Sequence, residues 1–336
     1  MEFFRGVNVD WLGKKWYFLA FSLIFSVAGI ISMAWHWKTT GEPVPLGVDF
    51  RGGTEVQVQF KQRPDIGAIR QAVDQAGFKD AKIQNYGGSA ERNEVLISLP
   101  EEHNEGSLDV GRQKVVTALH QYYASNPFDD AGVKVDVVGP TVGRQLEKQA
   151  GLATLYSLLG MLVYLWFRFQ LIYGVAAVVA CFHDTLITVG AFSLASALGF
   201  GNMEISLTVI AAILTLVGYS MNDTIVVFDR IRENLRLTRR EPLADVVNRS
   251  INQTLSRTVL TSGLTFLTVL SLYIFGGQVL RGFSFALVVG ILIGTYSSIA
   301  IAAPMLVAWQ EWRAGKNGGS GMSRAAVLPA AKRARI

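Results

Sequence analysis

Six long apolar stretches restrict the folds open to this chain more than any other feature. A helix needs about 20 predominantly apolar residues to cross the hydrocarbon core of a bilayer, and each stretch is near or above that length. Only 17% of the residues are charged, against about 25% in ordinary soluble domains. The sequence therefore predicts an α-helical membrane protein with six transmembrane helices, at residues 16–34, 151–167, 171–197, 205–228, 258–280 and 282–310.

The two ends of the chain differ from the spans. Residues 1–15 form a short basic head with aromatic side chains, which suits a membrane interface. Residues 312–336 are rich in Gly, Ala and Arg and predict a disordered basic tail that adheres to anionic membrane lipid. A cleavable signal peptide competes with the first span, because Ser32 and Ala34 resemble a cleavage site. The apolar run is longer than the roughly 7–15 residues of a signal core and further spans follow, so a permanent helix is favoured.

Residues 35–147 are the only part of the chain suited to a separate domain. They hold 12 Lys/Arg and 16 Asp/Glu, so this part is acidic within a chain of net charge +5. Alternation places Val56, Val58 and Phe60 on one face, as in a half-buried strand. The order strand–helix–strand–strand–helix–strand predicts a ferredoxin-like α+β (βαββαβ) domain, with strands at 54–60, 81–85, 94–99 and 132–138 and helices at 65–76 and 107–124.

The distribution of Lys and Arg among the short loops predicts the orientation of the spans. Basic residues gather in the head, after the second span, in the connection 229–257 and in the tail, whereas the loop 198–204 has none. Both termini are therefore expected in the cytoplasm. The acidic domain, inserted between the first and second helices, is expected on the opposite side of the membrane.

The connection 229–257 contains an amphipathic segment. Pro242 marks its start, and apolar residues follow at helical spacing: Leu243, Val246, Val247, Ile251 and Leu255. We expect this segment to lie along the cytoplasmic surface, either as an interfacial helix or as a contact for a partner protein.

Asp223 is a carboxylate inside the fourth apolar stretch. Such a charge costs about 2.5–3.5 kcal/mol on insertion scales, so by default it indicates a functional site. Six residues separate it from the charged cluster that starts at Asp229, which is about 9 Å of helix. The next span begins near Arg257, at a similar depth, so Arg257 is the expected partner. A carboxylate beside a guanidinium couples protonation to helix position. In the alternative interpretation the helix ends near Asn222, and both charges are interfacial.

His183 and Asp184 form a second ionisable pair at membrane depth, inside the third span. This pair is either a proton relay or a structural polar contact between helices. Ser220, Asn222 and Thr224 flank Asp223, where they could donate hydrogen bonds to it or line a wet path. The sequence has no metal-ligand spacing, phosphate-binding loop or nucleophilic triad around Asp223. We therefore expect no cofactor, no metal and no enzymatic reaction. Nucleic-acid binding is not expected either, because the basic residues follow the predicted cytoplasmic face of the membrane.

Three strings resemble SecF, a family of bacterial protein-export membrane subunits related to SecD. They are GVDFRGGTEV at 47–56, VGPTVGRQL at 138–146 and GYSMNDTIVVFDRIREN at 218–234. The likeness covers about residues 1–311, and the long Gly/Ala/Arg tail is its one departure. The third string is highly specific, whereas the first is shared with SecD. Within the first string a structural motif, predicted as a Gly-Gly bend into a strand, is formed by Gly47, Asp49, Arg51, Gly52 and Gly53.

The resemblance implies a multi-pass protein of the bacterial inner membrane with a periplasmic domain. Members pair with SecD, each giving six helices, in an arrangement similar to transporters of the resistance–nodulation–division type. The pair uses the proton-motive force to draw exported protein across the membrane after the ATP-driven step. The family's membrane aspartate and arginine map onto Asp223 and Arg257.

The resemblance also implies partners: SecD, the SecYEG channel, YajC and unfolded exported chains. Two alternatives to a proton-coupled subunit remain open. One is a structural, substrate-holding subunit whose proton path lies wholly in its partner, with Asp223 and Arg257 as a static bridge. The other is half of a proton-driven exporter, which would need a second copy of the chain.

Overall fold

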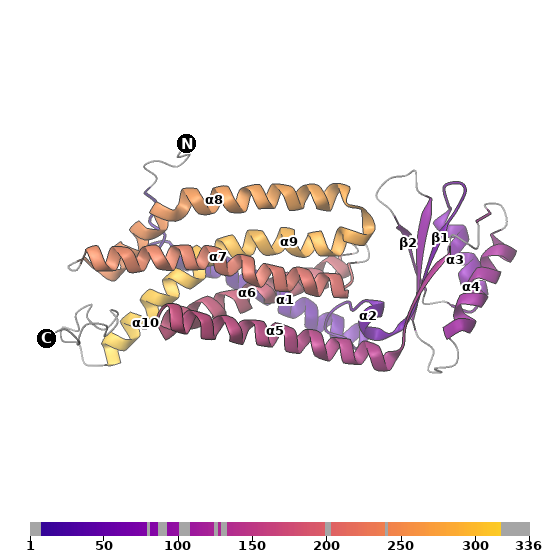
Figure 1. Ribbon diagram of the computed structural model, residues 1–336, viewed down its shortest axis with the longest axis horizontal. Helices are drawn as coiled ribbons and strands as arrows, with labels where there is room; N and C mark the ends of the chain where they lie inside the picture. Colours follow the sequence, from indigo (N-terminus) through magenta and orange to yellow (C-terminus); the bar gives the residue numbers. More distant parts are fainter. Residues whose placement is uncertain are drawn as a thin grey trace.

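The computed structural model describes residues 8–78, 81–86, 93–100, 108–123, 127–128, 133–198, 203–238 and 241–316. Within them, six helical spans form an elongated bundle, and a small α+β domain stands at one end of it (Figure 1). The six transmembrane helices and the inserted domain that the sequence predicts are confirmed. The spans are α1 (Lys15–Thr40), α5 (Pro140–Arg168), α6 (Leu171–Ala197), α7 (Leu207–Leu237), α8 (Leu243–Phe275), and a last one made of α9 (Gly277–Ser297), the π-helical turn η2 (Ser298–Ala302) and α10 (Ala303–Lys316).

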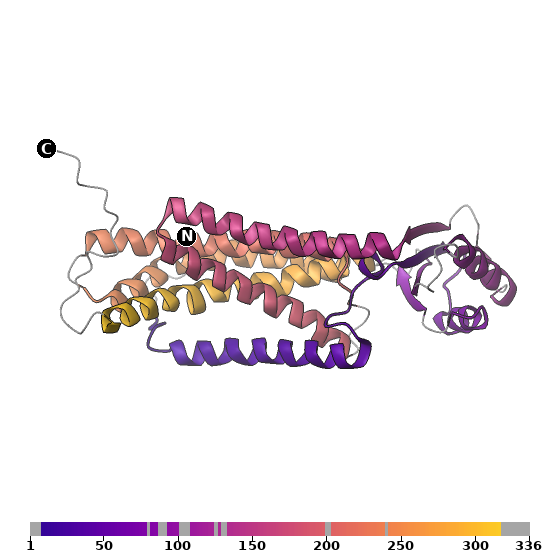
Figure 2. The same cartoon turned by 90° about the horizontal axis from the view of Figure 1, so that it is seen from below.

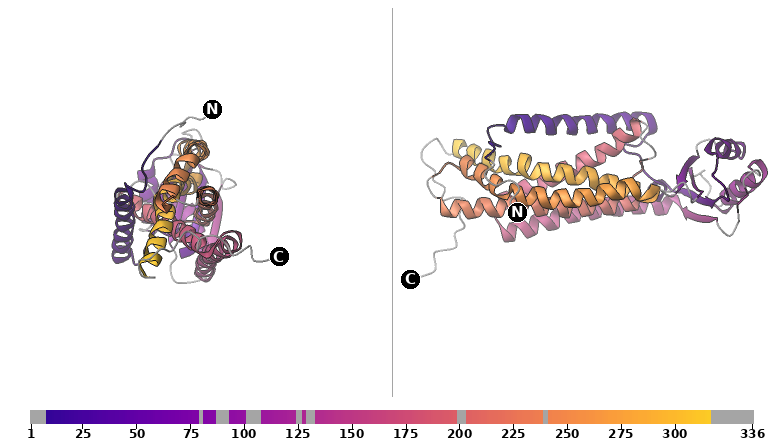
Figure 3. Two further views of the ribbon diagram at one scale, coloured as in Figure 1. Left: turned by 90° about the vertical axis from the view of Figure 1, so that its left-hand side faces the viewer. Right: turned by 90° about the horizontal axis from the view of Figure 1, so that it is seen from above.

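We call the end of the bundle beside the α+β domain the sheet end, and the opposite end the distal end. α1 begins and α10 ends at the distal end (Figure 1). α1 runs along one edge of the bundle in the views of Figures 2 and 3. It approaches α6 closely, because a Cβ added to Gly29 would lie 3.1 Å from the Gly190 Cα. Trp16 and Tyr17, near its start, are exposed in the single chain.

Two helices run past the apolar stretches that identified them. α1 continues beyond residue 34 to Thr40, and Gly41 ends it in the left-handed conformation (φ 82°). α5 begins at Pro140 rather than at residue 151, and proline suits the first helical position because its missing N–H would be unpaired there. An apolar stretch therefore marks the part of the helix suited to lipid, while the helix itself continues until a residue stops it.

The expectation of a separate surface helix within residues 229–257 is wrong. α7 continues to Leu237, and α8 is one uninterrupted helix from Leu243 to Phe275, with Pro242 immediately before it as predicted. The apolar face of the predicted segment is buried inside the bundle, where Val246 and Ile251 have no exposed surface. No Gly or Pro occurs between residues 243 and 262, so nothing interrupts the helix. A surface helix and a core helix share the same apolar period, which is why the pattern could not separate them.

The last two spans also differ from their predicted limits. α8 ends at Phe275, and the turn to α9 is made by Gly276 and Gly277, the latter with φ 75°. The disordered tail was expected from residue 312, but α10 extends to Lys316. Residues 317–336 of the predicted tail and residues 1–7 of the predicted head lie outside the described residues.

The α+β domain has the predicted element order and sheet. The strands run in the order β2-β3-β1-β4, and all neighbours are antiparallel. Figure 1 shows both helices on the face of the sheet that is turned away from the bundle. Val56, Val58 and Phe60 are buried against them, as their alternation predicts. The elements are β1 (Gly53–Gln59), α3 (Ile66–Gln75), β2 (Lys82–Tyr86), β3 (Glu94–Pro100), α4 (Leu108–Tyr122) and β4 (Lys134–Val138).

The bundle contains two apolar cores, which we call the distal core and the sheet-end core. The distal core joins α5, α6, α7, α8 and α10, and it includes Tyr173, Phe228, Ile231, Ile251 and Leu306. The sheet-end core joins α6, α7 and α9, and it includes Phe50, Phe192, Val209, Ile213 and Leu287. Polar side chains of α6, α7 and α9 lie between the two cores.

The motif GVDFRGG connects the α+β domain to α7. Its middle forms the short helix α2 (Val48–Arg51), and Gly52 (φ 82°) and Gly53 (φ 140°) then turn the chain into β1. A Cβ on Gly53 would lie 2.3 Å from the Leu99 carbonyl oxygen, so only glycine fits. Asp49 Oδ2 accepts a hydrogen bond from the backbone N–H of Leu207, the first residue of α7, at 2.8 Å. The predicted Gly-Gly bend is present, and the motif in addition caps a transmembrane helix.

Further contacts tie the same motif to the bundle. Phe50 lies in the sheet-end core with 3% of its surface exposed. Gly143, in the second family string, sits so close that a Cβ would lie 2.5 Å from the Phe50 carbonyl oxygen. Gly47 donates its N–H to the Ile205 carbonyl at 2.9 Å. Arg51 pairs with the half-buried Glu42 at 2.5 Å.

Candidate functional site

α7 presents three polar side chains to the layer between the two cores. Ser220, Asp223 and Thr224 have spacings of three and four residues, so they lie on one side of the helix. None is more than 3% exposed. Asp223 follows Leu207 by sixteen positions, or about 24 Å of helix, which places the carboxylate near the middle of this 31-residue helix.

Asp223 has a neutral hydrogen-bond partner. Ser262 on α8 donates its hydroxyl to Asp223 Oδ2 at 2.7 Å, and both side chains are buried. Arg257, the partner expected from the sequence, is exposed and forms no ion pair within 4.0 Å in the described part of the chain. It nevertheless lies within electrostatic range of Asp223. The expected ion pair is therefore not formed in this conformation: the register of α8 against α7 puts Ser262 opposite the carboxylate, and Arg257 lies about 7.5 Å closer to the distal end.

A row of buried hydroxyls continues along α8 from Ser262 toward the distal end. They recur every fourth residue and therefore share one face: Ser250, Thr254, Thr258 and Ser262, none more than 7% exposed. We call this row the hydroxyl seam. At its distal end the side-chain amide of Asn234, on α7, donates to Ser250 Oγ at 2.9 Å. Among the described residues, the Thr258 hydroxyl has no hydrogen-bond partner.

Asp184 on α6 is held by one side chain from each of two other helices and by its own neighbour His183. Its Oδ2 accepts hydrogen bonds from Ser220 Oγ of α7 at 2.6 Å and Ser297 Oγ of α9 at 2.7 Å. Its Oδ1 lies 3.1 Å from Nδ1 of His183. Asp184 has no measurable exposed surface. This carboxylate therefore joins three helices at one point, as a structural polar contact would.

His183 extends the cluster to the edge helix. Its Nε2 forms a hydrogen bond with Ser22 Oγ of α1. A second contact between the same two helices joins Ser32 and Ser193 at 3.0 Å. The sequence prediction found His183 and Asp184 but missed the three serines that bind them and Asp223: Ser22, Ser262 and Ser297. A lone serine in an apolar stretch is too common in membrane helices to single out.

Two glycines of α9 bring that helix close enough for the cluster to form. A Cβ on Gly290 would lie 2.4 Å from the Leu216 side chain, and one on Gly294 would lie 3.0 Å from the Ser220 Cβ. Small residues at such crossings let helix backbones approach closely. The approach at Gly294 places the next turn of α9, with Ser297, beside Asp184.

Asn222 and Thr224 were expected to support Asp223, and neither forms a hydrogen bond to it. Asn222 is exposed on the outer side of α7. Thr224 donates its hydroxyl to the Ser220 carbonyl of its own helix at 3.1 Å. The outer side of α7 also carries small or polar residues at helical spacing, namely Ala211, Thr215 and Gly218. An exposed amide at membrane depth is costly against lipid, so this side suits a neighbouring protein better.

Throughout the residues that the structure describes, no three His, Cys, Asp or Glu side chains gather as a metal-ion site. The single cysteine, Cys181, is buried and free. The charged groups at membrane depth are therefore a carboxylate with a neutral donor, a carboxylate in a serine–histidine cluster, and a nearby guanidinium. Such groups can exchange a proton or fix helices together.

Comparison with known proteins shows which family this chain resembles. A family model described as "Protein export membrane protein SecD/SecF, C-terminal" matches residues 119–312, and one described as "SecD/SecF GG Motif" matches residues 40–62. A protein translocase subunit SecF from Koribacter versatilis is 56% identical, covering 93% of this chain and 94% of the relative. Another, from Pseudomonas aeruginosa, is 41% identical, covering 89% and 91%.

A solved structure has the same fold. The crystal structure of SecDF from Thermus thermophilus, described as a translocon-associated membrane protein, superposes with a TM-score of 0.74 at 36% identity. The match covers 91% of this chain and 39% of the SecDF chain, so the present chain spans about two fifths of that protein. SecDF in a "super-membrane-facing form" gives a TM-score of 0.64. With its six spans, the chain is a multi-pass protein of the bacterial inner membrane. The chain belongs to the SecF branch of the SecD/SecF family of protein export membrane proteins.

Proposed function

We propose that this chain, paired with a SecD subunit, uses the proton-motive force to draw exported protein across the membrane after the ATP-driven step. The observation that carries the proposal is Asp223, a carboxylate buried at membrane depth on α7 and bonded to a neutral serine instead of a cation. One charge moving through the membrane potential yields about 2.3 kcal/mol per 100 mV. That is enough to bias a conformational equilibrium of a few kcal/mol.

The contact with Ser262 stands in both protonation states of Asp223. A serine hydroxyl donates to the ionised carboxylate, and it accepts from the protonated carboxyl after turning about its C–O bond. Arg257 attracts only the ionised form. Protonation therefore favours the arrangement with Ser262 opposite Asp223, and ionisation favours movement of α8 that brings Arg257 closer.

The hydroxyl seam offers a route for that movement. Thr258 lies four residues, or about one helical turn (about 6 Å), from Ser262 on the same buried face. If α8 moved by one turn toward the sheet end, Thr258 would replace Ser262 opposite Asp223, and Arg257 would come beside the carboxylate. One-turn shifts of packed elements are known switching movements. The unpaired hydroxyl of Thr258 supports this exchange, because in that position it gains a partner.

Asp184 has a different part in the proposal. Serine hydroxyls from α7 and α9 donate to it and His183 of its own helix lies beside it, so we assign Asp184 and His183 to the fixed framework against which α8 moves. α7 belongs to that framework through Ser220. The Asp49 cap and Phe50 then connect α7 to the α+β domain, which gives a rigid path of about 24 Å between the carboxylate and the domain.

The charge distribution supports the orientation that the proposal needs. Basic side chains gather at the distal end, as cytoplasmic positions do. They are Lys14, Lys15, Arg168, Arg230, Arg232, Arg236, Arg249, Arg257 and Arg313. Both termini would then be cytoplasmic and the α+β domain periplasmic, where it contacts the emerging unfolded chain. The SecYEG channel and YajC complete the proposed assembly, and the polar outer side of α7 is the face that we assign to SecD.

The test replaces Asp223 by asparagine in cells that depend on this chain. Asp223→Asn keeps the size and the acceptor for Ser262 but cannot ionise. We expect export to lose its dependence on the proton-motive force while the ATP-driven step and co-purification with SecD persist. Asp229→Asn is the matched control, because Asp229 lies on the same helix but is exposed. Normal potential-dependent export in Asp223→Asn would refute the proposal.

Two further experiments, a charge exchange and a purification, separate the two alternatives. A substrate-holding subunit with a static Asp223–Arg257 bridge would regain export when the two charges are exchanged, whereas a proton-exchanging carboxylate at position 223 would not be restored. A self-paired exporter would purify as a homodimer without SecD. The lack of an ion pair between the two residues in this conformation weighs against a static bridge.

A further inference from the structure

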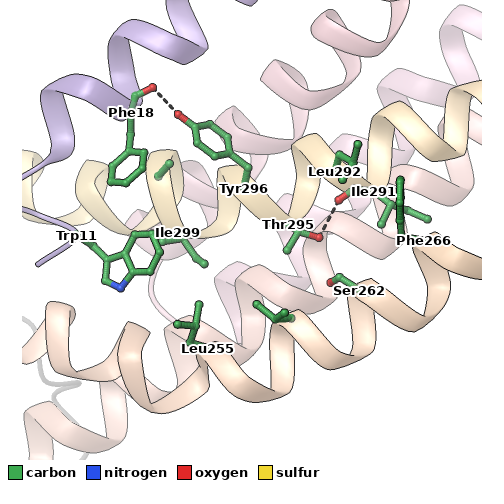
Figure 4. A pocket seen from close by; sticks show the side chains of 13 residues that line it. Trp11, Phe18, Leu255, Ser262, Phe266, Ile291, Leu292, Thr295, Tyr296 and Ile299 are labelled. Atoms are coloured by element: carbon green, nitrogen blue, oxygen red, sulfur yellow. Dashed lines mark hydrogen bonds between the residues drawn. The ribbon is translucent and has the colours of Figure 1, made fainter. Parts of the chain in front are cut away.

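An apolar cavity of about 350 Å³ lies beside the candidate site (Figure 4). Its walls come from α1 and the segment before it, from α8 and from α9, and they include Trp11, Phe18, Val259, Gly263, Leu292 and Tyr296. Val259 and Leu292 are 38% and 52% exposed in the single chain. The cavity is therefore open toward the lipid that surrounds the bundle.

The cavity extends from the membrane interface into the hydrocarbon region. At its distal end, Trp11 is followed by Lys14, Lys15 and the exposed aromatic residues Trp16 and Tyr17. Basic and aromatic residues of this kind gather at the level of lipid headgroups. At its inner end the wall includes Ser262, whose hydroxyl is bonded to Asp223.

The residues that form the cavity wall are held in place before any ligand enters. The backbone N–H of Trp11 donates to Asn248 Oδ1 at 2.8 Å, and its indole N–H donates to Asn252 Oδ1 at 3.0 Å. The Trp11 and Phe18 rings stack with centroids 5.6 Å apart. Across the cavity, the Tyr296 hydroxyl donates to the Phe18 carbonyl oxygen. A preformed site of this kind loses little freedom on binding.

We propose that this cavity binds one acyl chain of an anionic phospholipid from the leaflet at the distal end. The chain would lie along Phe18 and Val259 toward Ser262, and the headgroup phosphate would lie beside Lys14 and Lys15. The apolar walls at lipid depth select a hydrocarbon chain, and the two lysines select the negative headgroup. Asp10 is exposed in the turn just before these lysines, and its Oδ1 accepts a hydrogen bond from the backbone N–H of Gly13.

An acyl chain bound in the cavity would affect the candidate site through Ser262, which forms part of the cavity wall. A chain that fills the space on the α1 side of α8 would oppose displacement of that helix. This consequence rests on the proposed proton function, whereas binding of the chain does not. The test below therefore measures binding alone, and its outcome is independent of export.

Fluorescence quenching by brominated acyl chains measures this binding, because Trp11 forms part of the wall. The full chain is reconstituted with SecD in vesicles of phosphatidylglycerol or phosphatidylcholine whose chains carry bromine. The Trp11 contribution is the difference between the protein and its Trp11→Phe variant, since the chain has seven tryptophans. We expect this contribution to be quenched, and more strongly by phosphatidylglycerol.

A side chain added at Gly263 blocks the site and provides the decisive comparison. A Cβ at Gly263 meets no atom within 4 Å, so Gly263→Leu grows into the cavity without displacing the backbone. Gly160→Leu on α5 is the matched control, because its Cβ also meets no atom within 4 Å and the residue is remote from the cavity. We expect Gly263→Leu to lose the Trp11 quenching and Gly160→Leu to keep it, with equal unfolding midpoints.

Unchanged quenching in Gly263→Leu would overturn the site, and equal quenching by both lipids would overturn the headgroup assignment. Absence of Trp11 quenching with SecD bound would assign the cavity to a partner helix instead.

Discussion

Replacing Asp49 by alanine should loosen the first turn of α7 and leave both apolar cores intact. Asp49 accepts the N–H of Leu207 at 2.8 Å, and Ser206, the residue before α7, makes no side-chain cap of its own. An N-terminal cap contributes about 1 kcal/mol, and a negative charge at a helix N-terminus adds about 0.3–1 kcal/mol. Because this hydrogen bond is exposed to solvent, we take a total of about 1 kcal/mol, which is roughly a fivefold change in an equilibrium constant.

Hydrogen exchange of the purified protein measures this change. Amides in the first turn of α7 should exchange about fivefold faster in Asp49→Ala, while amides of β1 keep their protection. Asp49→Asn retains an acceptor oxygen but loses the charge, so its effect should be smaller. Glu42→Gln is the control, because it removes only the half-buried pair with Arg51. Unchanged exchange at the start of α7 in Asp49→Ala, or an equal increase throughout the bundle, would refute the assigned cap.

Three further substitutions test the packing around the site. Ser262→Ala removes the donor to the buried aspartate of α7 and should lower the free energy of unfolding by about 1–3 kcal/mol in denaturant titrations. Thr268→Ala is the control: it loses only an exposed hydrogen bond to a carbonyl of its own helix, so it should change the free energy of unfolding by much less. Gly290→Ala should destabilise by about 1–3 kcal/mol because its Cβ overlaps a leucine of α7. By contrast Gly263→Ala, with open space around it, should stabilise by up to about 1 kcal/mol through helix propensity, so equal melting temperatures for these two variants would contradict the close helix approach. Asn252→Ala removes the amide that bonds the backbone of residue 9 and the indole of residue 11; limited proteolysis should then cut before α1 faster than in the parent protein, and equal cleavage rates would disprove the clamp.

The α+β domain could be predicted from the sequence almost residue by residue. Its first strand alternates strictly, and slipping that strand by one residue would expose Val56 and Val58. The membrane spans were predicted in number for a similar reason, since a buried apolar run of that length has few alternatives. Their ends were not, because helices such as α5 and α8 continue through polar residues until Gly or Pro stops them.

The candidate site was predicted in part. Asp223 and Asp184 stood out because carboxylates are rare in apolar stretches. Their partners did not, because a contact between Asp49 and Leu207, or between Asp223 and Ser262, depends on how two distant elements pack. Depth estimated from loop charges placed Arg257 opposite Asp223, and the actual helix register differs by about one turn. A helical pattern specifies which face of α8 is buried but not its axial position against α7.

The division of the bundle into a distal core and a sheet-end core has a consequence for how its stability can be altered. Substitutions at sites that share no partners combine additively within about 0.5 kcal/mol, and the intervening polar layer keeps these two sets of side chains from sharing partners. Ile251→Val in one core and Ile213→Val in the other should each cost about 0.5–1.5 kcal/mol, and the double variant should show their sum. The two ends of the bundle are thus thermodynamically separable. A stabilising change at the end that holds the α+β domain can be combined with one at the other end without repacking either.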